Sequence, residues 1–197
     1  MERIILASAS GRRKILLEQL IGKNFDVCVS SYSEDEVHGI GPIELVMHHA
    51  LEKAKNVASK YKNGVIISAD TVILCKGEVL GKPANSKHAK EMLKKISGQE
   101  IQAITGLTVM EARVTKKVCA YEVTHLWIRE MTEGMIEDYV STEEPFGKAG
   151  SFAIQGKGAI LVERIEGDFF NVVGLPLFRL SGMLEEFDID ILNPCNL

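Results

Sequence analysis

Two long segments rich in strand-forming residues constrain the fold of this chain more than any other feature. Ile101–Arg113 and Lys117–Arg129 are both rich in Val, Thr and Ile, the residue types that favour β-strands. Val114–Lys116 separates them and is short enough to form a turn. The sequence therefore predicts a pair of long antiparallel strands in the middle of the chain.

Shorter strands and amphipathic helices precede and follow this pair. Short apolar or β-branched runs predict strands at Ile4–Ala7, Phe25–Ser30, Val65–Ile67, Thr71–Leu74, Glu78–Leu80 and Ala159–Ile165. Helical spacing of apolar residues, with capping residues or prolines at several starts, predicts helices at Arg12–Leu20, Pro42–Tyr61, Ser86–Ile96, Thr132–Val140 and Leu177–Phe187. We therefore expect one domain over residues 1–197 with an α/β or α+β fold, a mixed sheet flanked by helices.

Composition excludes several classes of protein. The chain has 197 residues and a formal net charge of −4, which argues against non-specific binding to nucleic acid. The N-terminal apolar run is too short for a signal peptide, and no run approaches the roughly 20 apolar residues of a membrane span. The four cysteines form no C-x-x-C pair, so we expect reduced thiols. These features predict a cytoplasmic protein with no membrane or nucleic-acid partner.

A candidate anion site follows the first predicted strand. Ser8 and Ser10 lie in a loop of small residues, and Arg12 and Arg13 open the predicted helix. The N–H groups at a helix start attract anions, and arginine can contact two phosphate oxygens at once. A capped helix with a solvated basic turn explains the same residues, so both interpretations stay open.

Asp70 and Lys53 are candidates for the chemistry itself. Asp70 follows the apolar run Val65–Ala69, so we expect it at the rim of the sheet, where ligands bind in open α/β folds. There it can hold a hard cation, act as a general base, or merely cap the turn into Thr71. Lys53 lies within the apolar stripe of the helix from Pro42, where a lysine either snorkels to the edge or projects into a cleft.

Three further groups of charges have two interpretations each. Lys82, in Gly81-Lys82-Pro83, and Lys148, in Gly147-Lys148-Ala149-Gly150, lie in conformationally limited segments. Each is either a fixed phosphate ligand or a loop charge. Glu34-Asp35-Glu36 is either part of a divalent-metal site or a solvated acidic loop.

Five motifs occur in order along the chain: Ile5–Arg13, Ser68–Val72, Gly81–Pro83, Glu144–Gly156 and Gly167–Leu177. Together they resemble the motifs of the Maf family of nucleotide pyrophosphatases, in which a proline is usual at the position of Gly11. The match extends from Ile5 to about Phe187. The resemblance implies an elongated mixed sheet flanked by helices, with two lobes and a deep central cleft, similar to inosine triphosphate pyrophosphatases.

The resemblance also implies a reaction. Family members cleave a nucleoside triphosphate between the α- and β-phosphates with a divalent cation, Mg²⁺ or Mn²⁺. By resemblance, Asp70 accepts a proton, while Arg12, Thr71 and Gln155 take part in base choice. The Thr and Gln pairing is similar to the subgroup that acts on dTTP and UTP. The Gln155 amide complements the N3–H and a carbonyl of uracil or thymine.

The combined hypothesis is a dTTP/UTP pyrophosphatase that removes unwanted nucleotides from the pool. Asp70 and Glu34 hold the metal, Asp70 or a nearby carboxylate orients the attacking water, and Lys53, Lys82 and Arg13 hold the triphosphate. Ser8, Ser10, Arg12, Thr71, Lys148 and Gln155 complete the expected substrate site. The family also suggests a homodimer. The alternatives are a purine pyrophosphatase for ITP, XTP or 7-methyl-GTP, and a nucleotide-binding regulator of cell division.

Overall fold

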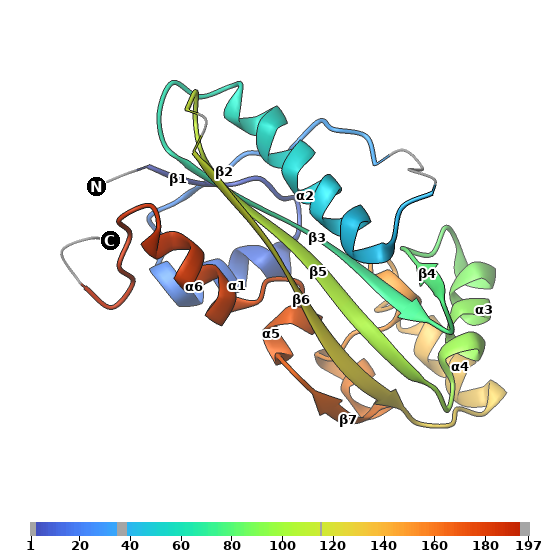
Figure 1. The fold of residues 1–197 in the computed structure, drawn as a ribbon. Coiled ribbons are helices and arrows are strands. Elements are labelled where there is room, and N and C mark those ends of the chain that lie inside the picture. The colour runs from blue at the N-terminus through green and yellow to red at the C-terminus, as the bar shows by residue number, and fades with distance from the viewer. Residues whose placement is uncertain (1–2, 35–38, 115, 194–197) are drawn as a thin grey trace. The chain divides into compact units, whose positions relative to one another are not determined.

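The computed structural model describes residues 3–34, 39–114 and 116–193, which form a seven-stranded mixed sheet with helices (Figure 1). The strands are β1 (Ile4–Leu6), β2 (Asp26–Val27), β3 (Val65–Cys75), β4 (Glu78–Leu80), β5 (Glu100–Glu111), β6 (Lys117–Ile128) and β7 (Val162–Glu166). The α-helices are α1 (Gly11–Ile21), α2 (Pro42–Ala58), α3 (Ser86–Ile96), α4 (Glu133–Ser141), α5 (Phe169–Val173) and α6 (Leu177–Glu185). Two 3-10 helices are η1 (Ala149–Ser151) and η2 (Gly156–Leu161). The predicted mixed α/β fold is confirmed.

The sheet combines parallel and antiparallel pairs. Its strands follow the order β2-β1-β3-β5-β6-β7, and β4 pairs with β3. β1 is parallel to β2 and β3, whereas β3 with β4 and β6 with β7 are antiparallel. β5 and β6 are neighbours joined by the short connection 112–116, which is too short for a parallel crossover. The predicted long antiparallel pair is therefore confirmed.

The chain divides into two compact units. Unit 1 contains Met1–Asp70, Thr105–Glu122 and Gly174–Leu197, and unit 2 contains Thr71–Ile104 and Val123–Val173. β3, β5 and β6 each contribute residues to both units. Two units agree with the two lobes implied by the family resemblance, whereas the single domain and the deep cleft stay predictions.

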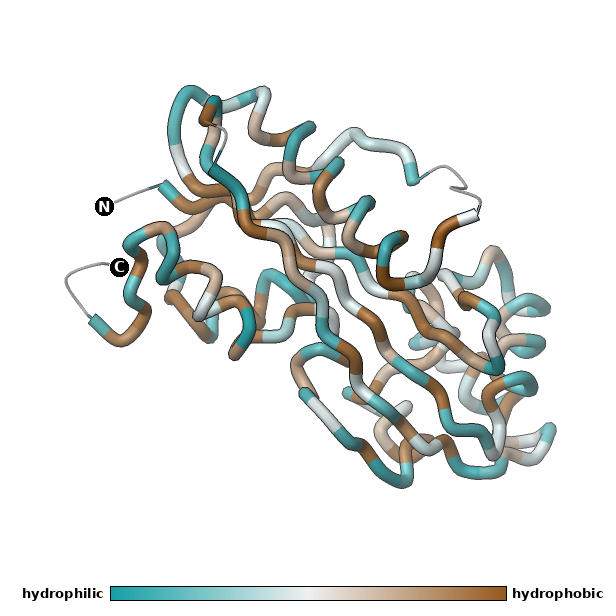
Figure 2. The backbone as a smooth tube through the Cα atoms, viewed as in Figure 1, coloured by the Kyte–Doolittle hydropathy of each residue, from teal (hydrophilic) through white to brown (hydrophobic). Residues whose placement is uncertain are grey.

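Helix α2 organises the core of unit 1. Figure 2 shows hydrophobic and hydrophilic residues alternating along this helix, as predicted for an amphipathic helix. Ala54 and Val57 belong to an apolar cluster with Ile5 of β1 and Ile66 of β3. The helix ends at Ala58 rather than at the predicted Tyr61, because the last N–H groups donate to carbonyls three residues back in a tighter turn.

The core of unit 2 joins helices α3 and α4 to the sheet. Leu93 of α3 and Ile136 of α4 are fully buried in a cluster with Leu126 of β6. Thr132 caps α4 as predicted. The predicted cap of α3 at Ser86 is wrong, because the side chain of Asn85 accepts the His88 N–H at 2.9 Å.

Strand β3 is longer than predicted and contains Asp70 in its interior. The expectation that Asp70 ends a strand at the rim of the sheet is therefore wrong. Ile66, Ser68 and Asp70 alternate with their neighbours and share one face of the strand. The Ser68 hydroxyl donates to the Ala50 carbonyl at 2.5 Å, and Asp70 accepts from Lys53. These partners satisfy both polar groups, so neither interrupts the strand.

Two further strands are several residues shorter at one end than predicted, and one helix was not predicted. β2 covers only part of the predicted Phe25–Ser30, because a side chain of α2 binds the end of that run. The predicted strand Ala159–Ile165 begins only at Val162, after the 3-10 turn η2. Helix α5 was not predicted, and the Asp168 carboxylate accepts the Phe170 N–H at 2.7 Å at its start.

Cysteine and membrane predictions are tested only within the described residues. Cys28, Cys75 and Cys119 are free thiols, as expected, whereas Cys195 lies outside the residues that the structure describes. No helix in the described part of the chain is long and apolar enough to cross a membrane.

The close approach of β5 to α2 generates a prediction about stability. A Cβ atom on Gly106 would lie 2.4 Å from the carbonyl carbon of Val46, which is backbone and cannot rotate away. We expect Gly106→Ala to destabilise the protein by about 1–3 kcal/mol, the range for overpacked cores, measured by thermal or urea unfolding.

Gly182→Ala is the matched control. Gly182 lies in α6, and a Cβ atom at this position would have nothing within 4 Å. Because alanine favours helices over glycine, this variant should gain about 0.5–1 kcal/mol. Equal destabilisation by both substitutions would contradict the close contact at Gly106.

Candidate active site

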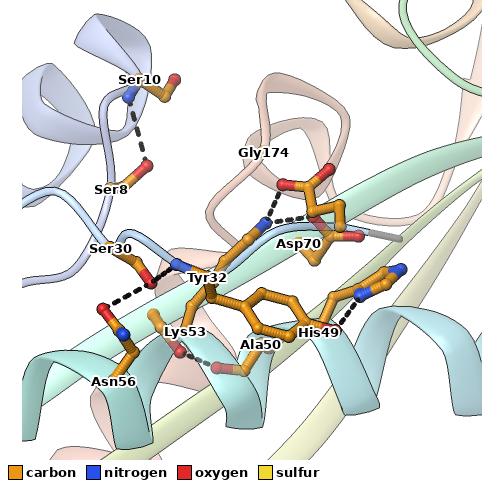
Figure 3. A network of polar contacts seen from close by, with 12 residues as sticks. Ser8, Ser10, Ser30, Tyr32, His49, Ala50, Lys53, Asn56, Asp70 and Gly174 are labelled. Atoms are coloured by element: carbon orange, nitrogen blue, oxygen red, sulfur yellow. Dashed lines mark hydrogen bonds and ion pairs between the residues drawn. The ribbon is translucent and has the colours of Figure 1, made fainter.

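A buried ion pair lies at the centre of the candidate site. Helix α2 directs Lys53 toward β3, where its Nζ donates to Asp70 Oδ1 at 2.6 Å (Figure 3). Lys53 is 9% exposed and Asp70 is 7% exposed, so this pair is removed from bulk water. Lys53 therefore does not snorkel into solvent, and Asp70 does not serve merely as a turn cap.

Glu34 provides a second carboxylate for the same ammonium group. Lys53 Nζ lies 2.5 Å from Glu34 Oε1. Counting side-chain atoms alone, Glu34 is 41% exposed and Asp70 is 9% exposed. Solvent therefore screens the attraction of Glu34 to Lys53 more strongly than that of Asp70. Asp35 and Glu36, the other members of the predicted acidic cluster, lie outside the described residues.

Helix α2 also binds the segment that carries Glu34. Asn56 Oδ1 accepts the Ser30 hydroxyl at 3.1 Å and the Ser31 N–H at 3.0 Å. The Tyr32 hydroxyl lies 3.0 Å from His49 Nδ1, and Figure 3 shows these two side chains directed toward each other. These contacts hold residues 30–32 against the helix and thereby position Glu34 beside Lys53.

The residues that make these contacts were not identified from the sequence. His49, Lys53 and Asn56 recur at spacings of four and three, which places them on neighbouring positions of one helical face. That spacing was a usable signal for a polar row along α2. Tyr32, the partner of His49, and Ser30, a partner of Asn56, show no such pattern, because they lie in a segment without regular structure.

The loop before α1 links its serines to Arg13. Ser10 caps the helix by accepting the Arg13 N–H at 3.4 Å, and Ser8 Oγ accepts the Ser10 N–H at 3.2 Å. Arg13 Nε donates to the Gly174 carbonyl at 2.7 Å. Burial lowers the pKa of Arg13, and the charges of Asp70 and Glu34 oppose this effect. Arg13 thus lies within electrostatic range of both carboxylates.

The predicted site residues divide between the two units. The structure brings seven together in unit 1: Ser8, Ser10, Arg12, Arg13, Glu34, Lys53 and Asp70. The other four belong to unit 2: Thr71, Lys82, Lys148 and Gln155. Because side chains alternate along a strand, Thr71 points to the face of β3 opposite Asp70.

Within unit 2, one backbone contact connects two predicted lysine segments. The Gly150 N–H donates to the Gly81 carbonyl at 3.0 Å, which joins the turn containing Lys148 to the residue before Lys82. Lys148 Nζ donates to the Glu144 carbonyl at 2.5 Å. Lys82 and Gln155 are exposed.

Known proteins with similar sequences align with this chain over nearly its full length. A dTTP/UTP pyrophosphatase of Methanococcoides burtonii is 54% identical over 195 residues, which cover 99% of this chain and 100% of that protein. A dTTP/UTP pyrophosphatase of Methanosarcina mazei is 53% identical, with 97% of each chain covered. One from Clostridioides difficile is 45% identical, over 93% of this chain and 94% of that protein.

A solved structure and a family model complete the comparison. A HAM1 protein from Coxiella burnetii matches with a TM-score of 0.47 and 16% identity, covering 65% of this chain and 73% of that chain. The family model described as Maf-like protein matches residues 3–187. With this match and relatives that share about half of its residues, the chain belongs to the Maf-like protein family.

Proposed function

We propose that this chain hydrolyses dTTP and UTP to the nucleoside monophosphate and pyrophosphate, and so keeps unwanted nucleotides out of the pool. The observation that carries the proposal is the buried Lys53–Asp70 pair, with Glu34 on the same ammonium group. The names of the relatives at 45–54% identity support the substrate class. A cytoplasmic location, which fits the expected reduced thiols, and a homodimer, which the family resemblance suggests, belong to the same proposal.

Asp70 has the surroundings of a positioned carboxylate. The ion pair with Lys53 restrains it in the interior of β3, and the contact uses Oδ1. A restrained carboxylate can accept a proton from an attacking water and direct that water at a phosphorus atom. We assign this role to Asp70, because Glu34 is held by a more exposed segment.

The acidic residues fit a divalent cation. Mg²⁺ and Mn²⁺ prefer oxygen ligands, and Mg²⁺ is commonly held by one or two carboxylates plus substrate phosphates. Asp70 and Glu34 supply two carboxylates. Because the described residues contain no group of three His, Cys, Asp or Glu side chains that could hold a metal, the remaining ligands would come from substrate phosphates and water. The bound cation would neutralise charge on the phosphate oxygens.

Positive groups are available for the phosphates. Arg13 is held by the Gly174 carbonyl, and α1 directs its N-terminal N–H groups toward the same loop as Ser8 and Ser10. Arg12, Lys53, Lys82 and Lys148 are the further proposed phosphate ligands. For the base, Gln155 offers a planar amide with one acceptor and two donors, which matches uracil and thymine better than cytosine.

The substrate assignment is tested by pyrophosphate release from dTTP, UTP, CTP, ITP and 7-methyl-GTP with Mg²⁺ or Mn²⁺. We expect the highest kcat/KM for dTTP and UTP. Gln155→Ala should lower the UTP:CTP ratio of kcat/KM about tenfold, which corresponds to about 1.4 kcal/mol. A preference for ITP would indicate the purine alternative, and nucleotide binding without turnover would indicate a sensor.

Asp70→Asn tests the carboxylate directly. We expect turnover to fall by about 100-fold or more, because an amide does not act as a general base. The melting temperature should also fall, because Lys53 loses a buried counter-charge, so turnover is measured at a temperature at which the variant remains folded. Asp138→Asn, an exposed change of the same kind in α4, should keep normal turnover. Near-normal turnover of Asp70→Asn would remove the central residue of the mechanism.

Glu34→Gln tests the proposed metal ligand. We expect the Mn²⁺ concentration for half-maximal activity to rise about tenfold, and calorimetric titration with Mn²⁺ to show the same weakening without turnover. Glu91→Gln, on the exposed surface of α3, is the control. Unchanged Mn²⁺ binding by Glu34→Gln would exclude Glu34 from the metal site.

A further inference from the structure

Two side chains of unit 2 hold the loop that carries Gln155. The Tyr139 hydroxyl donates to Glu144 Oε1 at 3.0 Å and accepts the Ala153 N–H at 3.1 Å. Glu144 also accepts the Lys157 N–H at 2.9 Å and the Gly158 N–H at 2.8 Å. The backbone is therefore bound two residues before Gln155 and again two and three residues after it.

Glu144 acts as a charged acceptor inside this loop. Burial by itself would raise its pKa, but the N–H groups of Gly158 and Lys157, with Tyr139 and the charge of Lys148, outweigh it and lower the pKa. An ionised carboxylate only accepts, and hydrogen bonds to charged acceptors are stronger than neutral ones. The Tyr139 hydroxyl and the N–H groups of Lys157 and Gly158 therefore all donate to one ionised carboxylate.

The backbone at Gly156 passes close to the Glu144 carboxylate. Gly156 has a φ of +68°, and a Cβ atom there would lie 2.6 Å from Glu144 Oε2. Any larger residue would be strained and would press against the carboxylate that the following N–H groups bind. Gln155 is exposed, although the anchor before it joins the buried Tyr139 to the buried Ala153, and the anchor after it includes the buried Gly158. An exposed side chain on an anchored backbone is a suitable element for recognising a ligand.

We propose that Glu144 and Tyr139 are positioning residues for base selectivity. They fix the backbone on both sides of Gln155, so that its amide meets a pyrimidine in one orientation. A glutamine on an unrestrained loop would lose conformational freedom on binding and could turn its amide to suit cytosine. This inference rests on the proposed function, because it requires Gln155 to recognise the base.

A double-mutant cycle tests the inference. The variants are Glu144→Gln, Gln155→Ala and their combination, each assayed for the UTP:CTP ratio of kcat/KM. A glutamine at 144 presents an NH₂ group to N–H donors and cannot satisfy all three. We expect Glu144→Gln to lower the ratio about fivefold to tenfold, and to cause no further loss when Gln155 is already alanine. Glu143→Gln, the same change at the exposed preceding residue, should leave the ratio unchanged.

Tyr139→Phe provides a second, less disruptive variant. It removes the hydroxyl and keeps the buried ring, so the Ala153 amide should exchange its hydrogen faster and the UTP:CTP ratio should fall. This variant carries the test if Glu144→Gln fails to fold.

The outcomes separate the inference from the proposed function. If Gln155→Ala changes the ratio but neither Glu144→Gln nor Tyr139→Phe does, the inference is overturned and base recognition by Gln155 stands. An equal loss from Glu144→Gln in the Gln155→Ala background also overturns it, because Glu144 would then act by another route. If Gln155→Ala itself leaves the ratio unchanged, the proposed base recognition fails, and the inference fails with it.

Discussion

The contact between Lys53 and Asp70 is the interaction on which the rest of the candidate site depends. Two charges that are each more than nine-tenths buried are stable only as a pair, since an unpaired buried charge costs several kcal/mol. The pair joins α2 to the interior of β3, and it allows a carboxylate to lie on a buried face of that strand. Ser68, two residues earlier, is satisfied by the same helix through the Ala50 carbonyl. Helix α2 is thus both the main apolar support of unit 1 and the source of its polar partners.

Much of the fold could be predicted because it depends on local patterns. The long pair of strands β5 and β6, the amphipathic helix α2 and the Thr132 cap follow from composition, periodicity and capping chemistry. The prediction failed where tertiary partners decide the structure. Asp70 was expected to end a strand, but β3 continues through it, and Lys53, 17 positions earlier, pairs with its buried charge. No pattern within β3 contains that information.

Less of the site than of the fold could be predicted. The pattern placed Lys53 within the apolar stripe of α2 but left open whether it snorkels to the edge or projects into a cleft, and the structure shows it buried. The segment after β2 was expected to continue as a strand to Ser30, but the side chain of Asn56 replaces the backbone partner that a strand would need. The loop around Gln155 was equally inaccessible to prediction, because one carboxylate and one phenol hydroxyl bind its backbone through contacts that have no periodicity.

The polar row on α2 has a consequence for how activity is gained during folding. His49, Lys53 and Asn56 contact Tyr32, Asp70 and Ser31, and all three contacts require the helix in a single register. A shift of the helix by one residue would rotate this row by about 100° and break the three contacts together. A partly docked α2 could therefore be compact and helical, yet it would leave Asp70 without Lys53. Recovery of catalysis in a refolding experiment would then report the seating of one helix, later than signals of secondary structure.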